Sequence, residues 1–301
     1  VFMGTPKFAV PILHELNKSS DKIVAVYSQP AQKAKRGQKL VISDIEELAQ
    51  KLSLNIRTPT KLDDNEYSYL KSLHPDIVVV VAYGKIIPKF FLDLPKFGFI
   101  NLHASLLPRW RGAAPIQRSI MNCDKETGVS FMKVQEKLDT GPYMLQIKTS
   151  INNEMNYKEL SEKLSKLGAK NIVKCLDLIY KNKAKFINQD NSKASYANKI
   201  KKSEARIIWS ESANKIIAKI NGLNPFPGAW FEYKNSRFKL LKAKEVQKKS
   251  GEPGEVLNEK LTIACGKNAL EVIEIQKEGK KVLKINEFLS GNFISKGTKL
   301  R

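Results

Sequence analysis

Two short polar motifs carry the side chains best suited to chemistry. The first is Asn101-Leu102-His103, at the end of a predicted strand. Residues 101 and 103 alternate along that strand, so their side chains point to the same face. An amide can donate a hydrogen bond to a developing oxyanion, and an imidazole can move a proton. The pair therefore suits a reaction at a carbonyl group, and the alternative is a polar cap on a strand end.

The second motif is the turn Asp139-Thr140-Gly141-Pro142. A carboxylate beside an imidazole fixes its tautomer and favours its protonated form. The Gly-Pro pair makes a fixed turn that could hold Asp139 against the strand that carries His103. Taken alone the turn is weak evidence, because aspartate is common in turns. The other two histidines, His14 and His74, are expected to be structural or solvated.

The elements that must position these residues alternate between strand and helix in the first half of the chain. Short β-branched runs predict buried strands at 1–3, 22–28, 76–81 and 98–103. Helical spacing of apolar residues predicts helices over 9–17, 42–52 and 63–73, with N-caps at Ser43 and Asp63. Such alternation implies a mostly parallel sheet with helices on both faces. His103 would then lie at the carboxyl end of a strand, where open α/β sheets bind ligands.

The second half of the chain changes character. Residues 128–134 and 142–151 predict edge or antiparallel strands, and a long helix follows over 157–180. The polar, Lys- and Asn-rich stretch 184–203 is predicted to be a linker between a catalytic domain, 1–183, and a second domain, 204–301. That domain holds one helix and several short strands, which favour a small β-barrel or sandwich. The helix is predicted over 212–223 and the strands over 229–233, 238–246, 261–264, 270–276 and 282–288.

Charge is unevenly distributed along the chain. Lys and Arg number 52 against 30 Asp and Glu, a net charge of +22. Residues 181–301 contain 26 basic and 12 acidic side chains and so carry +14 of it. The excess suggests a polyanionic partner, either nucleic acid or an anionic membrane, and the alternative is a Lys-biased composition. A small basic barrel favours nucleic acid.

Several classes of protein are disfavoured. No apolar run approaches the ~20 residues that cross a bilayer, and no secretory signal is visible, although a few residues before Val1 are expected to be missing. Cys123, Cys175 and Cys265 form no C-x-x-C pair, which argues against a disulfide scaffold and a zinc site. Neither G-x-G-x-x-G nor a P-loop occurs in the sequence, which disfavours an enzyme that uses a nicotinamide cofactor or ATP. The turn Gly4-Thr5-Pro6 after the first strand either is structural or faces a ligand of another kind. A cytoplasmic, metal-free monomer is the expectation.

The two motifs together resemble a known family. N-L-H-x-S-L-L-P followed by D-T-G-P is similar to the signature of the 10-formyltetrahydrofolate-dependent formyltransferases, and Asn101, His103 and Asp139 match that family's catalytic Asn, His and Asp. The resemblance implies that an amine attacks the formyl carbon of the folate cosubstrate. It implies a Rossmann-like catalytic domain and an OB-like C-terminal barrel. The implied folate-contacting residues are Ser105, Leu106, Leu107, Pro108, Ile86, Ile87 and Leu138.

Segments outside this core resemble the members of the family that formylate methionyl initiator tRNA. They are F-M-G-T-P at 2–6, R-W-R-G-A-A-P-I at 109–116 and N-P-F-P-G-A at 224–229. The basic loop 29–40 matches a loop that enters the acceptor end of the tRNA, although Lys35 stands where the family often has glycine. The resemblance implies that the loop's basic residues, Lys33, Lys35, Arg36 and Lys39, bind tRNA. Without it, a solvated basic turn is the simpler interpretation.

Two other functions stay open. One is a formyltransferase of the same superfamily that acts on a small amine, such as an amino sugar nucleotide or a purine precursor. It would not need the basic second domain or the loop 33–39. The other is a non-catalytic RNA-binding protein on the same scaffold, which would have no reason to keep Asn101, His103 and Asp139 together.

Overall fold

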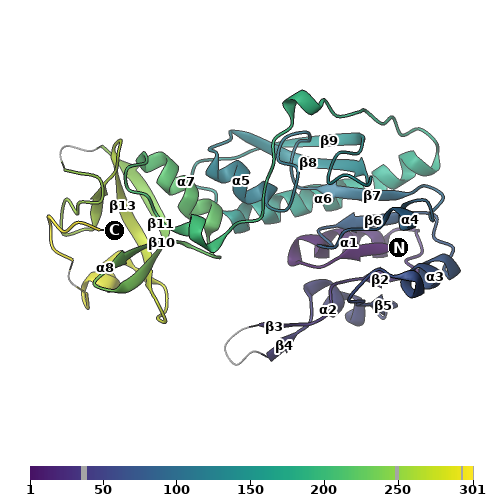
Figure 1. Cartoon of the computed structure of the whole chain (residues 1–301), viewed down its shortest axis with the longest axis horizontal. Helices are drawn as coiled ribbons and strands as arrows, with labels where there is room; N and C mark the ends of the chain where they lie inside the picture. Colours follow the sequence, from purple (N-terminus) through teal and green to yellow (C-terminus); the bar gives the residue numbers. More distant parts are fainter. Residues whose placement is uncertain (35–38, 248–250, 293, 301) are drawn as a thin grey trace. The chain divides into compact units, whose positions relative to one another are not determined.

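The structure is a computed structural model of the 301-residue chain, and it describes all residues except 35–38, 248–250, 293 and 301. The chain forms two compact units. Unit 1 comprises Val1–Pro115, Thr127–Thr149 and Ser161–Ala197, and unit 2 comprises Ile116–Glu126, Ser150–Leu160 and Asn198–Arg301. Figure 1 labels most of the helices and strands of both units.

Unit 1 is built on a seven-stranded sheet with the order β5-β2-β1-β6-β7-β8-β9. The first five are mutually parallel, whereas β8 runs antiparallel to β7 at the far side. This confirms the predicted parallel sheet with an antiparallel extension. The strands are β1 (Phe2–Gly4), β2 (Val26–Tyr27), β5 (Ile56–Arg57), β6 (Val78–Val81), β7 (Phe99–His103), β8 (Glu126–Lys133) and β9 (Tyr143–Ser150).

The strand order explains why helices cover both faces of this sheet. From β1 the chain moves outward to β2 and β5, and it then returns to the other side of β1 to add β6 and β7. Crossovers between parallel strands are right-handed, so reversing the direction of winding moves the helices to the opposite face. The helices of unit 1 are α1 (Val10–Lys18), α2 (Asp44–Lys51), α3 (Asp64–Ser72), α4 (Lys89–Leu92) and most of α6 (Tyr157–Tyr180), whereas α5 (Pro115–Met121) belongs almost entirely to unit 2.

Both predicted N-caps are confirmed. The Ser43 hydroxyl accepts a hydrogen bond from the Glu46 backbone N–H at 2.9 Å, and the Asp63 carboxylate accepts one from Glu66 N–H at 3.1 Å. Each satisfies a backbone donor that the first turn of a helix leaves without a partner. The Ser43 hydroxyl also bonds to that of Ser28, which is fully buried at the end of β2.

Replacing Ser43 by alanine is expected to lower the free energy of unfolding of unit 1 by about 1 kcal/mol, the usual cost of losing a capping side chain. The loss also leaves the Ser28 hydroxyl without this partner. Urea titration of the full chain measures the change. Ser68→Ala, at an exposed position inside α3, is the matched control and should change stability by a few tenths of a kcal/mol. Equal stabilities of the two variants would contradict the capping role.

Unit 2 packs helix α7 (Ala213–Leu223) on an antiparallel sheet with the order β10-β11-β13-β12, and β14 also pairs with β13. Its core joins apolar residues of α7 such as Ile216 and Ile220 to Phe231, Phe238 and Trp209. This confirms the predicted β-rich second domain. The strands are β10 (Ala229–Tyr233), β11 (Ser236–Val246), β12 (Thr262–Ala264), β13 (Ala269–Lys277) and β14 (Leu283–Lys284).

The segments that differ from the prediction include 282–288 and the basic loop 29–40. The strand predicted over 282–288 is only β14, because the chain turns into helix α8 (Ile285–Leu289), which buries Phe288. The basic loop 29–40 contains a short ladder in which β3 (Gln32–Ala34) pairs antiparallel with β4 (Lys39–Val41). Both differences concern strands of two or three residues, which are too short for alternation to reveal.

The predicted linker is divided between the two units. Residues 184–197 belong to unit 1, where Ile187 exchanges two backbone hydrogen bonds with Tyr143 of β9. A short 3₁₀ turn follows at Asn191–Lys193. Residues 198–203 belong to unit 2, in which a second turn, Lys202–Ala205, is held by Arg118 of α5 through Glu204. The predicted domain limits 1–183 and 204–301 stay a prediction.

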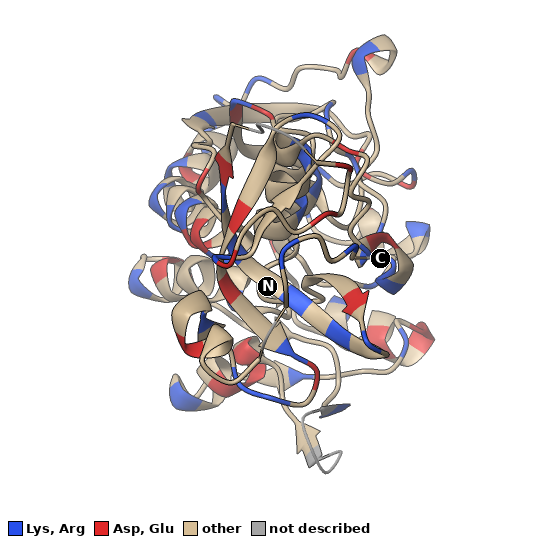
Figure 2. Ribbon diagram, turned by 90° about the vertical axis from the view of Figure 1, so that its left-hand side faces the viewer, with Lys and Arg blue, Asp and Glu red and all other residues tan. Residues whose placement is uncertain are grey.

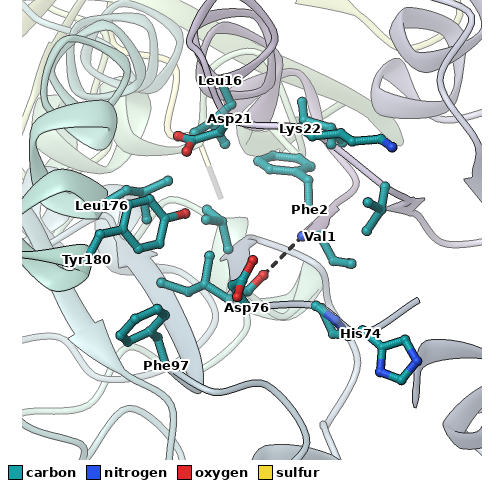
Figure 3. Close-up of a pocket in the computed structure, with 15 residues that line it drawn as sticks. Val1, Phe2, Leu16, Asp21, Lys22, His74, Asp76, Phe97, Leu176 and Tyr180 are labelled. Carbon is teal, nitrogen blue, oxygen red and sulfur yellow. Dashed lines mark hydrogen bonds between the residues drawn. The ribbon is translucent and has the colours of Figure 1, made fainter. Parts of the chain in front are cut away.

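A hollow of about 450 Å³ lies at the edge of the sheet where the parallel strands begin (Figure 3). Its lining includes Phe2, Asp76, Phe97 and Tyr180, and the Val1 amino group donates a hydrogen bond to Ile77 O at 3.0 Å beside it. His103 ends β7 and therefore lies at the opposite edge. The hollow is thus separate from the residues that the sequence singles out. Among the described residues no helix is long and apolar enough to cross a membrane.

Candidate active site

Strand β7 presents Asn101 and His103 on one face of the sheet. Its neighbours fix the register, because Asn101 lies opposite Val80 of β6 and His103 lies opposite Ser130 of β8. Leu102 points the other way and packs against Gly168 of α6, where an added Cβ would lie 2.4 Å from a Leu102 methyl carbon. The two polar side chains are therefore on the face away from α6, at the carboxyl end of a parallel strand.

His103 is held by the segment that follows the strand. Its Nε2 lies 2.8 Å from the carbonyl oxygen of Trp110. A carbonyl oxygen only accepts, so Nε2 carries a hydrogen and donates it. The other nitrogen, Nδ1, faces Asp139 with 3.6 Å between Nδ1 and Oδ2, and both side chains are about nine-tenths buried (7% and 12% exposed). The structure thus brings together the predicted His103 and Asp139 from motifs far apart in the sequence.

The Asp139 carboxylate has a second contact. Its Oδ2 accepts a hydrogen bond of 2.8 Å from the backbone N–H of Gly112. This bond turns the carboxylate toward His103 and partly compensates the loss of water. Asp139 itself has a φ of +51°, in the left-handed region that residues other than glycine rarely occupy. Two residues on, an added Cβ on Gly141 would lie 1.9 Å from the Lys133 carbonyl oxygen, so only glycine fits there.

Asn101 differs from its two companions. It is half-buried, and no side-chain hydrogen bond joins it to another residue in the described part of the chain. Its amide therefore keeps both donors for a ligand. Asn101 lies two residues before His103 on the same face of the sheet, and its role as oxyanion donor stays a prediction.

The predicted folate-contacting segment 105–108 is anchored by groups that the sequence did not single out. The hydroxyl of Ser105, which is fully buried, donates to Arg109 O at 2.6 Å. Ser130 donates to Ser105 O at 2.6 Å, and Gln146 donates to Leu107 O at 2.7 Å. Leu107 is also buried, whereas Leu106 and Pro108 are half-buried. Ser105 therefore shapes the segment from inside.

Exposed apolar side chains mark the loops around these residues. Ile86, in the loop after β6, is 87% exposed, and Leu138, next to Asp139, is 66% exposed. Ile87 is half-buried and packs on the core of unit 1. Exposed leucine or isoleucine is unremarkable singly. Ile86 follows β6 at the carboxyl edge of the sheet, and Leu138 directly precedes Asp139, whose carboxylate faces His103.

The loop after β6 is tied down from two other strand ends. Thr5, in the turn after β1, donates to Tyr83 O at 2.9 Å, and the Gln29 amide after β2 donates to the same oxygen at 3.0 Å. The turn Gly4-Thr5-Pro6 therefore has a structural use. Lys85 donates to the carbonyl oxygens of Pro59 and Thr60, and burial lowers the pKa of its ammonium group.

The predicted tRNA-binding residues are only partly described. Lys33 lies exposed on β3, and Lys39 begins β4. Lys35 and Arg36 lie outside the described residues. No group of three His, Cys, Asp or Glu side chains suited to a metal ion occurs in the part of the chain that the structure describes.

Sequence reasoning missed the residues that frame the site. Trp110 and Gly112 bind His103 and Asp139 through their backbones, which no side-chain pattern reveals. Arg111, only 2% exposed, bonds to Gln189 and Asn191 at 2.9 Å each. The R-W-R-G motif is visible in the sequence, but residues 189 and 191 lie in a stretch whose composition predicts a linker.

Comparison with known proteins identifies the family of both parts of the chain. A model of the formyl transferase family matches residues 1–176, and one of the formyl transferase C-terminal domain matches residues 199–292. The solved N-formyltransferase from Helicobacter canadensis, in complex with folinic acid and dTDP-3-aminofucose, has a TM-score of 0.67 at 19% identity. The alignment covers 90% of this chain and 97% of that one, which shows the same fold.

Relatives with higher sequence identity show which formyl transferases the chain is most similar to among those compared. The methionyl-tRNA formyltransferase of Pelagibacter ubique (strain HTCC1062) is 53% identical over 307 residues, covering all of this chain and 97% of that protein. That of Bradyrhizobium diazoefficiens is 44% identical over 305 residues, covering 99% of this chain and 98% of that protein. At this identity over both domains, the chain belongs to the methionyl-tRNA formyltransferase family.

Proposed function

We propose that this protein transfers the formyl group of 10-formyltetrahydrofolate to the α-amino group of methionine esterified to initiator tRNA, giving N-formylmethionyl-tRNA. The observation that carries the proposal is the joining of three groups at one strand end. The Asn101 amide makes no side-chain hydrogen bond to another described residue, and His103 and Asp139 face each other with most of their side-chain surface buried. These groups suit a reaction that passes through a tetrahedral oxyanion.

The reaction needs a neutral amine and a stabilised oxyanion. A free α-amino group has a pKa of about 7.7–8.0, and the neighbouring ester lowers it, so a strong base is unnecessary. The amine nitrogen forms a bond to the formyl carbon, and the carbonyl oxygen becomes an oxyanion to which Asn101 donates. The intermediate then breaks the bond to N10 of the folate. The amine loses one proton and N10 gains one, so the protons balance.

His103 is the group that moves this proton in the proposal. Its Nε2 is occupied by the Trp110 carbonyl at 2.8 Å, so Nδ1 is the nitrogen that gains and loses a proton. Asp139 Oδ2, 3.6 Å from Nδ1, stabilises the imidazolium that forms. The folate cosubstrate would lie over the carboxyl ends of β6 and β7. Exposed Ile86 and Leu138 supply apolar contacts for its flat ring.

The tRNA contacts rest on charge. Lys33, Lys35, Arg36 and Lys39 all belong to the basic loop 29–40. Residues 181–301 add most of the excess positive charge. Figure 2 shows Lys and Arg on helices and strands alike, with Asp and Glu among them. A phosphate backbone is a polyanion that Lys and Arg side chains can neutralise.

The test is transfer of labelled formyl from 10-formyltetrahydrofolate to purified methionyl initiator tRNA, with a dTDP-linked amino sugar as the competing acceptor. The sugar is included because the Helicobacter canadensis structure of the same fold holds dTDP-3-aminofucose. Transfer to the tRNA and not to the sugar supports the proposal. Transfer to the sugar alone would assign a small-molecule enzyme, and tRNA binding without transfer would assign an RNA-binding protein.

Salt should weaken the use of tRNA. Two neutralised phosphates predict about a tenfold loss of affinity between 50 and 200 mM monovalent salt, and more contacts predict a steeper loss. Titration of fluorescent initiator tRNA at several salt concentrations measures it. The rate at saturating tRNA is the control and should change little, because binding no longer limits it. A flat affinity would contradict backbone recognition.

A further inference from the structure

Asp139 occupies a backbone conformation that its surroundings must hold in place. Its φ of +51° places it in the left-handed region, where a side chain crowds the following carbonyl oxygen. A residue held there can relax into a commoner conformation and take its carboxylate away from His103. The contacts that oppose this relaxation therefore matter for the 3.6 Å approach of the two side chains.

One side-chain amide binds the turn on both sides of Thr140. Gln189 Nε2 donates to the carbonyl oxygen of Asp139 at 2.9 Å and to that of Gly141 at 2.7 Å. Both acceptors are backbone atoms, so the amide fixes the path of the chain through Asp139. Gln189 lies 50 residues further along the sequence, and it belongs to the same compact unit.

Arg111 determines which way the Gln189 amide points. Its Nε donates to Gln189 Oε1 at 2.9 Å. A guanidinium only donates, so the amide oxygen must face Arg111 and the NH₂ group must face the two carbonyls. Arg111 is 2% exposed, and its Nη2 donates to Asn191 Oδ1 at 2.9 Å. The buried cation therefore holds the 189–191 turn at two points.

The backbone of the same tripeptide binds both members of the His103–Asp139 pair. Trp110 O accepts from His103, and Gly112 N–H donates to Asp139. Arg111, between them, exchanges backbone hydrogen bonds with the stretch after Gln189: its N–H donates to Ser195 O at 2.8 Å, and its carbonyl accepts from Ala197 at 2.7 Å. Residues 110–112 and 189–197 thus form one frame around the two side chains.

We propose that Gln189 is a positioning residue for formyl transfer: oriented by Arg111, it holds the Asp139 turn in the conformation that presents the carboxylate to His103. The proposal rests on the role given to Asp139 under the proposed function. It assigns a catalytic consequence to a stretch, 184–197, that its composition marks as a linker. Outer-shell partners that orient metal ligands change activity by about 10- to 100-fold, and we expect a similar effect from this amide.

Gln189→Glu separates the two contacts of the amide. A carboxylate at residue 189 keeps an oxygen for Arg111, so the 189–191 turn stays anchored. It cannot donate a hydrogen bond to the carbonyl oxygens of Asp139 and Gly141. We expect kcat to fall about 10- to 100-fold, with KM for tRNA and for the folate changed less than threefold and the melting temperature nearly unchanged. Gln189→Met removes the donors and also the oxygen that Arg111 binds, without adding charge, and should lower kcat at least as much. Gln50→Glu, at an exposed position of α2, is the matched control.

A double variant distinguishes positioning from general damage. In Asp139→Asn the carboxylate is already lost, so adding Gln189→Glu should lower the residual rate by less than threefold if Gln189 acts through Asp139. A full further loss would overturn the proposal, as would normal kcat in both single variants. A rise in KM at unchanged kcat would also overturn it. If the wild type itself transfers no formyl group, the proposed function fails. This inference alone is refuted if the wild type is active, Asp139→Asn is inactive and both Gln189 variants are active.

Discussion

Replacing Asp139 by asparagine is expected to lower kcat for formyl transfer to methionyl initiator tRNA by about 10³- to 10⁴-fold, the range seen when a buried carboxylate partner of a catalytic histidine is neutralised. Such a loss corresponds to about 4–5 kcal/mol of transition-state stabilisation. Asparagine has nearly the same shape, and its amide oxygen can still accept the hydrogen bond from Gly112 N–H. The change therefore removes charge and leaves the packing.

The physical reason lies in what faces His103. When the imidazole takes a proton at Nδ1, the Asp139 carboxylate at 3.6 Å is the charge that stabilises the cation. Both side chains are largely buried, and the attraction is stronger there than in water. An asparagine amide in the same place presents either a neutral oxygen or an NH₂ group, and the second would oppose protonation. The imidazolium that passes its proton to N10 is then less stable, and the proton transfer is slower.

The measurement is single-turnover formyl transfer at saturating tRNA and folate, so that binding does not enter the rate. Asp93→Asn, at an exposed position after α4, is the matched control and should retain full activity. Binding of initiator tRNA to Asp139→Asn should stay within about threefold of the wild type. A variant with more than a tenth of the parent rate would remove Asp139 from the mechanism.

Local patterns predicted the parts of this fold whose causes are local. The Ser43 and Asp63 caps follow from short polar side chains before an apolar helical repeat, and both side chains accept from the third residue on. Helix α6 begins and ends at the predicted residues 157 and 180. Alternation along β7 placed Asn101 and His103 on one face. Each feature needs only a few neighbouring residues to specify it.

The features that escaped prediction depend on distant partners. Strand β5 is two residues long and exists because β2 offers it an edge. The 282–288 segment has a strand-like composition, but burial of Phe288 in the core of unit 2 is achieved by helix α8. Tertiary packing overrides propensity in such short segments.

The candidate site shows the same division. The sequence predicted the site's three central residues, because the side-chain types amide, imidazole and carboxylate are those that a carbonyl reaction uses. The frame around them was not found, because Trp110 and Gly112 act through backbone atoms and Arg111 bonds to a residue 78 positions away. The composition of a polar stretch such as 184–197 predicts a linker. It does not reveal that a side chain in the stretch donates hydrogen bonds to backbone carbonyls far away in the sequence.

Replacing Asn101 by alanine is expected to lower kcat about 10²- to 10³-fold, the usual cost of losing one oxyanion donor. Asn101 makes no side-chain hydrogen bond to another described residue, so its removal breaks no contact of the free protein in that part of the chain. The loss should therefore appear in the rate of the chemical step, with little change in melting temperature. Asn65→Ala, exposed on α3, is the matched control.

Asn101→Asp tests whether the Asn101 side chain donates a hydrogen bond to the oxyanion or only fills space in the folate site. Aspartate fills the same volume, so a residue that merely shaped the folate site would tolerate it better than alanine. An oxyanion donor gives the opposite order, because a carboxylate presents negative charge where the transition state develops it, and like charges repel strongly in a site shielded from water. We therefore expect Asn101→Asp to be at least as slow as Asn101→Ala in single-turnover transfer at pH 7.5. A faster aspartate variant would take oxyanion stabilisation away from Asn101 and leave that task to His103.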